Sequence, residues 1–294
     1  MQAADIRTVG VVGCGLMGSG IAEVCARSGY TTVVREVNDE LLSRGLERVG
    51  ASMETAVQRG KLSAEDRDGA RGRLRGTTRL AEFAACDLVV EAATENLAIK
   101  RDTFAELDRV CPPHALLASN TSSIPIIQMA TATRRPDKVL GLHFMNPVPV
   151  MPLIEMVRAL TTSDETLATA RAFGDSLGKR LIVSKDRGGF IVNYLLIPYL
   201  LDAIRMLEQG FASPEDVDVG MMLGTSYPMG PFTLLDFVGL DTTLFIADVL
   251  FEEFKEPRFA APTLLKHMVA AGYHGRKTGR GFYNYAAGER PPTR

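Results

Sequence analysis

A glycine-rich turn close to the N-terminus constrains the fold of this chain more than any other feature. The apolar run Ile6–Val12 is typical of a buried strand, and the pattern Gly13-x-Gly15-x-x-Gly18 separates it from a stretch with helical apolar spacing. In a strand–turn–helix unit the first glycine permits the tight turn, the second lets the backbone approach a pyrophosphate, and the third allows close helix–strand packing. The pattern therefore predicts a dinucleotide-binding turn, and a glycine turn without a ligand is the less favoured alternative.

An acidic residue after the next strand supports this interpretation. The expected strand Thr31–Val34 leads into Arg35 and Glu36, and Glu36 lies 18 residues after Gly18. A carboxylate there would accept hydrogen bonds from the adenosine ribose hydroxyls and repel a 2′-phosphate, which favours NAD over NADP. Arg35 leaves the choice open, because a neighbouring arginine can accommodate the 2′-phosphate. The cofactor contacts expected from this region are Gly13, Gly15, Leu16, Met17, Gly18 and Glu36.

The order of the remaining apolar segments predicts the fold class. Buried strands alternate with helical patterns such as Leu97–Val110, and this alternation is typical of a parallel sheet with helices on both faces. Two more strands are expected around a helix at Asp164–Leu177. The prediction is an α/β, Rossmann-type, mostly parallel sheet with further strands at Asp87–Glu91, Ala115–Ser119, Val139–Phe144, Leu153–Val157 and Leu181–Val183.

Two changes in sequence character define the expected domains. The polar segment Asp39–Arg73 is helical in pattern and broken at Gly60, which indicates a helical hairpin inserted between strands. Strand signals nearly vanish after Lys185, and the apolar spacing becomes helical. We therefore expect an NAD-binding Rossmann-type domain with an inserted hairpin at 1–185 and an all-helical domain at 186–294.

Composition excludes several classes of protein. The 294 residues are enough for two domains, and 33 Lys+Arg against 35 Asp+Glu provide no basic excess for a dedicated nucleic-acid binder. No apolar run reaches the roughly 18–20 residues that cross a bilayer. The four cysteines lack the C-x-x-C spacing of zinc sites, so we expect no metal, no disulfide framework and a reducing cytoplasm. The N-terminus shows no signal-peptide pattern.

Three polar features supply candidate catalytic groups. His143 is expected at the carboxyl end of a strand, where open α/β sheets bind their ligands, although a lone histidine there is more often structural. Glu155 is embedded in an apolar run, and a turn between two strands could bring it beside His143; an exposed position on a half-buried strand is equally compatible. The polar cluster Ser119–Ser123 leaves a third strand, and a helix N-cap explains one of its serines but not the whole cluster.

These residues carry a resemblance to a known family. The chain resembles the short-chain L-3-hydroxyacyl-CoA dehydrogenases, and most of all the bacterial 3-hydroxybutyryl-CoA dehydrogenases. The His143 and Asn193 segments are the most specific part of the resemblance. The matching stretches run in order along nearly the whole chain, at Gly13–Gly20, Ser119–Ser123, Gly141–Met151, Gly189–Asn193, Tyr227–Pro231 and Lys277–Tyr283.

The resemblance implies a division of labour for NAD-dependent interconversion of an L-3-hydroxyacyl-CoA and its 3-ketoacyl-CoA. His143 would exchange the proton of the C3 hydroxyl as general acid/base, and Glu155 would bind the other ring nitrogen. Ser122 would bind the C3 oxygen. Asn193, from the helical domain, would orient the reacting end of the substrate and complete the site at the domain junction.

The resemblance also implies the remaining contacts. Glu95 and Lys100 would contact the nicotinamide end of NAD, although from sequence alone they look like solvated helix charges. The expected cofactor contacts are completed by Asn120 and Asn146, and the phosphates of CoA are expected near Ser52, Arg59 and Lys61. An acyl-CoA substrate and a homodimer through the helical domain follow from the same resemblance. The chain departs from the family pattern at Glu36, where Asp is usual, and at Tyr194, where Arg is frequent.

Two alternatives remain. One is a dehydrogenase of free 3-hydroxy or sugar acids, similar to the lambda-crystallin and gulonate dehydrogenase group, which the segment Phe144–Met151 fits less well. The other is an NAD-binding protein that has lost catalysis. It is disfavoured because Ser122, His143, Glu155 and Asn193 are all present.

Overall fold

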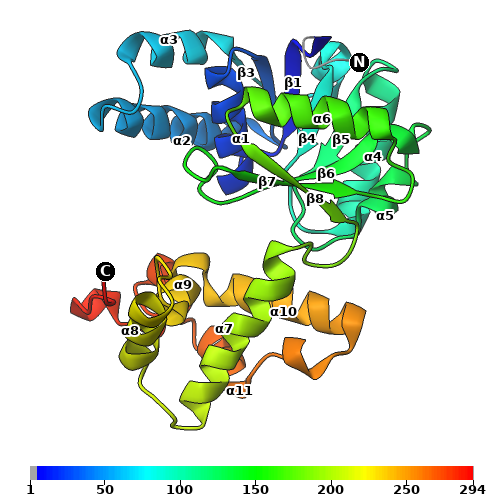
Figure 1. The fold of residues 1–294 in the computed structure, drawn as a ribbon. Coiled ribbons are helices and arrows are strands. Elements are labelled where there is room, and N and C mark those ends of the chain that lie inside the picture. The colour runs from blue at the N-terminus through cyan, green and yellow to red at the C-terminus, as the bar shows by residue number, and fades with distance from the viewer. Residues whose placement is uncertain (1–4, 294) are drawn as a thin grey trace. The chain divides into compact units, whose positions relative to one another are not determined.

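The computed structural model describes residues 5–293 and consists of two compact units (Figure 1). The division falls between Arg187 and Gly188. We call the part that precedes it the sheet unit and the part that follows it the helical unit, and describe each by itself.

The sheet unit contains one eight-stranded sheet with the order β3-β2-β1-β4-β5-β6-β7-β8. Neighbouring strands from β3 to β6 are parallel, β6 and β7 are antiparallel, and β7 and β8 are parallel to each other. The predicted Rossmann-type, mostly parallel sheet is therefore confirmed. The strands are β1 Thr8–Val12, β2 Thr31–Arg35, β3 Leu74–Thr77, β4 Leu88–Glu91, β5 Leu116–Ser119, β6 Val139–Phe144, β7 Leu153–Arg158 and β8 Arg180–Lys185.

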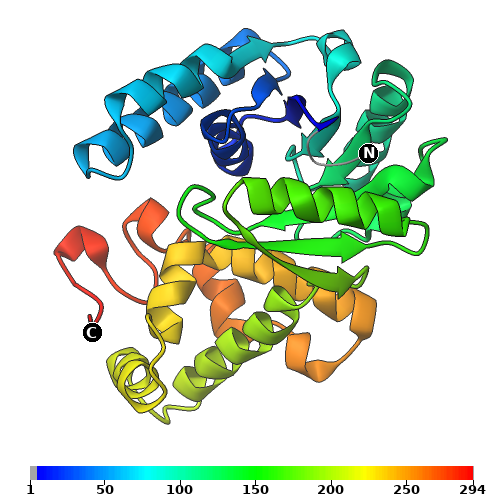
Figure 2. The ribbon, with the colours of Figure 1, turned by 45° about the horizontal axis from the view of Figure 1, so that its top comes forward.

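Helices cover both faces of this sheet (Figures 1 and 2). Ile21 of α1 and Phe173 of α6 belong to the same apolar cluster as Val11 and Leu142 of the strands. The α4 helix contacts α5 and the 3-10 segment η2 instead. Because the strand residues are apolar on both faces, the sheet and the helices that cover it form a common core. The helices are α1 Leu16–Arg27, α4 Leu97–Val110, α5 Ile126–Ala130 and α6 Asp164–Ser176, with 3-10 segments η2 Leu80–Ala85 and η3 Pro136–Lys138.

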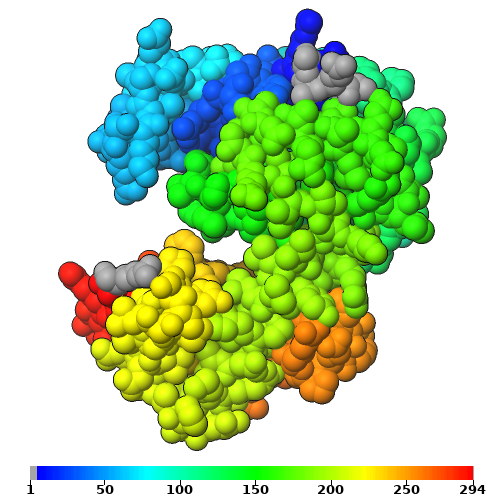
Figure 3. Space-filling view, in the orientation of Figure 1, coloured from blue at the N-terminus to red at the C-terminus, as the bar shows by residue number. Residues whose placement is uncertain are grey.

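A helical hairpin leads from β2 to β3. It consists of α2 (Asp39–Gln58) and α3 (Ala64–Arg73), and Figure 3 shows it standing out from the rest of the sheet unit. The side chain of Asn38 caps the first helix at Leu41 N, and that of Ser63 caps the second. Its inner face buries a small apolar cluster against α1, formed by Ala26, Val49, Met53 and Ala70.

One strand was not predicted. The edge strand β3 follows the hairpin directly and reads Leu-Arg-Gly-Thr, with one large apolar residue in four positions. Its hydrogen bonds to β2, where Leu74 pairs with Thr32 and Thr77 with Arg35, create the strand. Pairing with an existing sheet edge therefore decides the conformation here, because the segment has no strand pattern of its own.

The helical unit packs around its own core. Buried apolar residues from several helices meet there, among them Ile204, Phe232, Leu250 and Phe259. Two buried carboxylates fix its connections: Asp218 accepts hydrogen bonds from the first N–H groups of α9, and Asp236 accepts them from the backbone near Tyr283. The helices are α7 Val192–Glu208, α8 Pro214–Gly224, α9 Pro231–Val238, α10 Leu240–Phe254 and α11 Thr263–Ala270, with 3-10 segments η4 Pro257–Phe259, η5 Arg276–Thr278 and η6 Tyr285–Ala287.

Within residues 5–293, no helix combines the length and the apolar character that crossing a membrane requires.

Candidate functional site

The glycine-rich turn lies between β1 and α1, and its three glycines are required for different reasons. Gly13 has φ +92°, and a Cβ on it would lie 2.8 Å from the carbonyl oxygen of Ala92. A Cβ on Gly18 would lie only 1.9 Å from the carbonyl oxygen of Gly13. A Cβ on Gly15 would meet no atom within 4 Å. The first and third glycines thus let the chain fold, whereas the second leaves open space at the N-terminus of α1, where a dinucleotide pyrophosphate fits.

Glu36 is held against this turn. Its Oε1 accepts a hydrogen bond of 2.6 Å from the backbone N–H of Cys14, and its Oε2 accepts one of 3.0 Å from Val37 N. The neighbouring Arg35 directs its Nε to the carbonyl oxygen of Thr78, 3.4 Å away. The carboxylate of Glu36 therefore lies at the turn, as a ribose-binding acid requires, while the Arg35 side chain is bonded elsewhere.

Cys14 lies in the glycine-rich turn, where the helical hairpin packs against it. It is 1% exposed, and Arg48 donates a 3.0 Å hydrogen bond to its carbonyl oxygen. A Cβ on Gly45 of α2 would lie 2.3 Å from Cys14 Sγ, so the hairpin approaches the turn this closely only with glycine at position 45. Burial, together with the charge of Glu36 and against that of Arg48, raises the pKa of the thiol to about 11. Cys14 is thus a packing residue in its neutral form at ordinary pH.

The carboxyl ends of β1, β4, β5 and β6 lie along one edge of the sheet because these strands are parallel. Asn120 links two of them. Its backbone N–H donates to the carbonyl oxygen of Glu91 at 2.7 Å, and its side-chain Oδ1 accepts from Phe144 N at 2.9 Å. Asn120 is buried, so it fixes the backbone beside His143 and leaves little of its side chain to contact a cofactor.

His143 and Glu155 form a buried pair at this edge. They face each other in the register of the antiparallel strands β6 and β7, and His143 Nδ1 lies 2.7 Å from Glu155 Oε2. His143 is 7% exposed and Glu155 is 0% exposed, so the glutamate is not on a solvated face. A buried carboxylate that binds one ring nitrogen fixes the orientation and the tautomer of the imidazole. The arrangement can therefore take and release a proton through the other ring nitrogen, Nε2.

The polar loop 119–123 folds around Glu95. Oε1 of Glu95 accepts hydrogen bonds from Ser122 N at 3.2 Å and from Ser123 Oγ at 3.1 Å, and it also accepts one from the Thr121 hydroxyl. Burial alone would raise the pKa of Glu95, but the charge of Lys100 and these hydroxyls together lower it below the usual value. Glu95 thus holds the loop that carries Ser122.

Lys100 is buried, and its partner is a residue that the sequence analysis did not single out. It lies in α4 but is only 1% exposed, so it is not a solvated helix charge. Its Nζ lies 2.7 Å and 2.9 Å from the two carboxylate oxygens of Glu91 and 3.2 Å from Glu95 Oε2. The signal that could have found Glu91 is the one that found Glu155, an acid within the apolar sequence of a strand.

The loop between β6 and β7 carries Asn146 and is anchored by Lys179. The Lys179 ammonium donates to the carbonyl oxygens of Val148 and Met151 at 2.7 Å and 2.8 Å. Asn146 is exposed and precedes Pro147 through a cis peptide bond. Asn146 is therefore exposed to solvent, while Lys179 fixes the later part of the loop, at Val148 and Met151, to the rest of the sheet unit.

The proposed contacts to CoA lie along the hairpin. Ser52 is half-buried in α2, Arg59 is the exposed C-cap residue of that helix, and Lys61 is exposed in the turn that follows. Residues seven positions apart lie on the same face of a helix, so Ser52 and Arg59 share a face.

Asn193 belongs to the helical unit, where it is a half-buried residue in the first turn of α7. Its neighbour Tyr194 packs edge-on against Phe254, and the guanidinium of Arg258 lies 4.5 Å from the centre of the Tyr194 ring. The departure from the family pattern at position 194 is therefore absorbed in helix packing.

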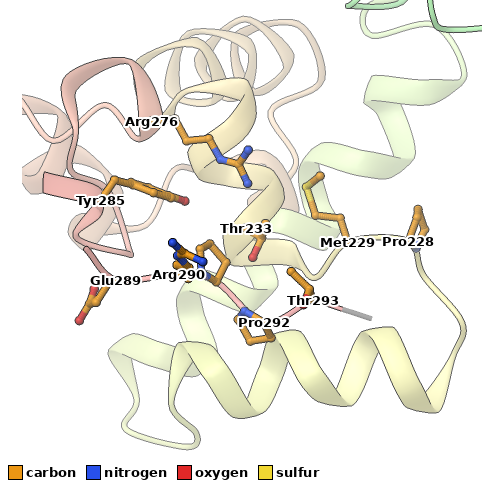
Figure 4. Close-up of a pocket in the computed structure, with 10 residues that line it drawn as sticks. Pro228, Met229, Thr233, Arg276, Tyr285, Glu289, Arg290, Pro292 and Thr293 are labelled. Carbon is orange, nitrogen blue, oxygen red and sulfur yellow. The ribbon is translucent and has the colours of Figure 1, made fainter. Parts of the chain in front are cut away.

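A separate pocket occurs in the helical unit. Figure 4 shows Arg276 and Tyr285 on one side of it and Thr233 and Met229 on another, with Arg290 between Tyr285 and Thr233. Within residues 5–293, none of the residues predicted for catalysis or cofactor binding lines this pocket.

A Rossmann-type sheet with an imidazole–carboxylate pair and a dinucleotide-type turn at the same edge is typical of NAD-linked dehydrogenases. Comparison with family models agrees with this class. Residues 8–187 match the NAD binding domain of 3-hydroxyacyl-CoA dehydrogenase, and residues 189–285 match its C-terminal domain. The chain belongs to the 3-hydroxyacyl-CoA dehydrogenase family, and it is an NAD-dependent dehydrogenase.

Individual relatives are similar over nearly their full length. A 3-hydroxybutyryl-CoA dehydrogenase of Mycobacterium tuberculosis is 54% identical over 282 residues, which cover 95% of this chain and 99% of the relative. One from Bradyrhizobium diazoefficiens is 42% identical over 293 residues, with both chains fully covered. The crystal structure of FadB2 from M. tuberculosis has a TM-score of 0.94 at 54% identity, covering 95% and 99% of the two chains. That of (S)-3-hydroxybutyryl-CoA dehydrogenase PaaH1 from Ralstonia eutropha has a TM-score of 0.91 at 44% identity, covering 96% and 99%.

Proposed function

We propose that the protein interconverts L-3-hydroxyacyl-CoA, with short-chain 3-hydroxybutyryl-CoA as the preferred form, and the corresponding 3-ketoacyl-CoA. The observation that carries this proposal is the buried His143–Glu155 pair at the carboxyl edge of a sheet that also carries the glycine-rich turn. The names of the relatives, 3-hydroxybutyryl-CoA dehydrogenase in several bacteria, support the substrate class.

The residues of the pair act on the proton of the reaction. Oxidation of a 3-hydroxyacyl-CoA removes a hydride from C3 and a proton from the C3 hydroxyl, and bound NAD supplies the hydride acceptor. His143 takes the proton on Nε2, and Glu155 stabilises the imidazolium through Nδ1. In the reductive direction His143 returns the proton to the C3 oxygen.

Other residues bind and orient. Ser122 donates a hydrogen bond to the C3 oxygen, and Asn193 orients the reacting end of the substrate. Glu95, Lys100, Asn120 and Asn146 form the surroundings of the nicotinamide end of NAD, and Leu16 and Met17 supply backbone N–H groups to the pyrophosphate from the start of α1. Ser52, Arg59 and Lys61 bind the phosphates of CoA, because two cations and a hydroxyl on one helical hairpin suit a polyanionic ligand.

We further propose a homodimer formed through the helical unit, and a cytoplasmic location. Exposed apolar side chains on α7, its following turn and α8 support the dimer: Leu195 is 66% exposed, Phe211 is 76% and Leu223 is 68%. Four buried free cysteines suit a reducing compartment. Sedimentation at low protein concentration tests the dimer, and a monomer there would contradict it.

The test of the function is a substrate panel. Purified protein is mixed with acetoacetyl-CoA and NADH, and NADH loss is followed by absorbance; longer 3-ketoacyl-CoA chains, NADPH, free 3-hydroxybutyrate and L-gulonate with NAD are run alongside. We expect turnover of the CoA thioesters, highest for the four-carbon chain, and negligible turnover of the free acids. Faster turnover of a free acid would instead favour the sugar-acid and hydroxy-acid dehydrogenases, and no turnover at all would favour a protein that only binds NAD.

A further inference from the structure

Glu91, the last residue of β4, is completely buried and fully bonded. It is 0% exposed, and Lys100 Nζ donates to both of its carboxylate oxygens at 2.7 Å and 2.9 Å. Ser119 Oγ donates to Oε2 at 2.7 Å, and Ala93 N donates to Oε1 at 2.8 Å. Such a carboxylate touches neither a cofactor nor a substrate, so any influence on the reaction passes through its partners.

Negative charge exceeds positive charge in this network, because the carboxylates of Glu91 and Glu95 share one ammonium. Lys100 is the ammonium bonded to both Glu91 and Glu95, and its side chain is 1% exposed. A buried ammonium depends on the acceptors around it, since desolvation is costly and water does not replace a lost partner. The position of Lys100 Nζ is therefore set mainly by Glu91, which provides the two shortest contacts.

Two chains of hydrogen bonds lead from Glu91 to the polar loop. One runs through Lys100 to Glu95, which accepts from Ser122 N and Ser123 Oγ. The other runs through Ser119, whose Oγ also accepts from Thr121 N at 3.2 Å. The same strand end also reaches the glycine-rich turn, because the carbonyl oxygen of Ala92 lies against Gly13.

We propose that Glu91 is a positioning residue for the nicotinamide end of the cofactor, acting through Lys100 and Ser119 rather than by contact. This inference rests on the proposed function, because it needs NAD to bind along this sheet edge. Disturbing this network should weaken the binding of NAD and NADH. It should weaken the binding of the acyl-CoA substrate by a smaller factor, because the substrate meets the network only through Ser122 and its CoA phosphates are bound on the hairpin.

The test variant is Glu91→Gln, which keeps the size of the side chain and removes its charge. We measure the Kd of NADH by fluorescence titration, the KM of NADH, the KM of acetoacetyl-CoA, and the Tm. We expect the Kd and KM of NADH to rise about tenfold, the size expected for a lost charge-assisted hydrogen bond. The KM of acetoacetyl-CoA is expected to rise by a clearly smaller factor than that of NADH, because the network reaches the substrate only through the loop of Ser122. The second variant, Ser119→Ala, removes one donor and is expected to shift the NADH values in the same direction by a smaller factor.

Asp108→Asn is the matched control. Asp108 lies in the same helix as Lys100, about 12 Å further along its axis. It is 4% exposed and is bonded to Arg134 and Arg135 at 3.0 Å and 2.7 Å. This buried acid-to-amide change should lower the Tm and leave the Kd of NADH unchanged.

The outcomes separate the two proposals. The positioning role is overturned if Glu91→Gln lowers the Tm as much as Asp108→Asn does but leaves the Kd of NADH at the wild-type value. If Glu91→Gln does not fold, an unchanged Kd of NADH in Ser119→Ala overturns it. Absence of NADH binding by the wild-type protein overturns the proposed function first, and the positioning role with it.

Discussion

His143 and Glu155 are direct partners in the register of two antiparallel strands, with Nδ1 of one 2.7 Å from Oε2 of the other. Directly opposed residues in such a pair project to the same face of the sheet, so the backbone hydrogen bonds of β6 and β7 bring the two side chains together. The pair is thereby built on two hydrogen-bonded strands and not on a loop.

Replacing the histidine should separate catalysis from folding. For His143→Ala we expect kcat to fall by about 10²–10⁴-fold, the usual contribution of a positioned general acid or base, while NADH still binds. The control is His114→Ala, since the His114 side chain is 52% exposed and is bonded to Asp87 at 3.0 Å, outside the site. Steady-state kinetics and NADH titration measure both effects, and unchanged turnover in His143→Ala would refute the assignment.

The pairing itself has a signature in stability. In His143→Ala the buried Glu155 carboxylate loses the imidazole as a partner, which is destabilising for a buried acid. Adding Glu155→Gln to this variant should therefore raise its Tm, although Glu155→Gln alone should lower the Tm of the wild type. A double variant less stable than His143→Ala would contradict the pairing.

Glu36 should determine the choice of cofactor. For Glu36→Gln we expect the preference for NAD over NADP to fall about tenfold, because the charge that repels a 2′-phosphate is lost while the amide oxygen can still accept from Cys14 N. Glu40→Gln, an exposed acid in the first turn of α2, controls for the change in net charge. Equal weakening of both cofactors would remove Glu36 from the ribose.

The lowered pKa of Glu95 predicts a dependence of stability on acid. The folded chain holds this carboxylate ionised to lower pH than the unfolded chain, in which the pKa of Glu is about 4.5. The stabilisation is therefore complete above that pH and is lost as the pH falls through the lower folded-state pKa. Urea unfolding should show Glu95→Gln clearly less stable than wild type at about pH 7, and the difference should shrink at about pH 4 and below. The exposed Glu106→Gln serves as control, and a difference independent of pH would contradict the prediction.

The anchored loop should depend on its lysine. Lys179→Met leaves the carbonyl oxygens of Val148 and Met151 without their ammonium donor, and we expect a loss of about 1–3 kcal/mol in the free energy of unfolding. Lys185→Met changes an exposed lysine at the end of β8 and should cost much less. Urea unfolding compares the two, and equal losses would show that the loop does not need Lys179.

The parts of the molecule that sequence could predict are those with local patterns. The glycine-rich turn and the buried strands follow from spacing and apolar runs. Glu155 follows from the cost of burying an acid. The strand β3 could not be predicted, because Leu74–Thr77 takes its conformation from β2. Nor could the burial of Lys100, since its charge is compensated by Glu91, nine positions earlier and in a different element. No local pattern encodes such a pairing across elements.

The reactivity of the buried cysteines can be used to measure local unfolding of the chain. Cys14 and Cys25 are 1% and 0% exposed, and burial is the main cause that raises their pKa values, to about 11 and about 12. A maleimide or disulfide reagent in neutral solution can therefore modify them only during transient unfolding. Because Cys14 lies in the glycine-rich turn and Cys25 in the helix that follows it, their labelling rates would record how much a bound dinucleotide suppresses excursions of this segment, without any engineered probe.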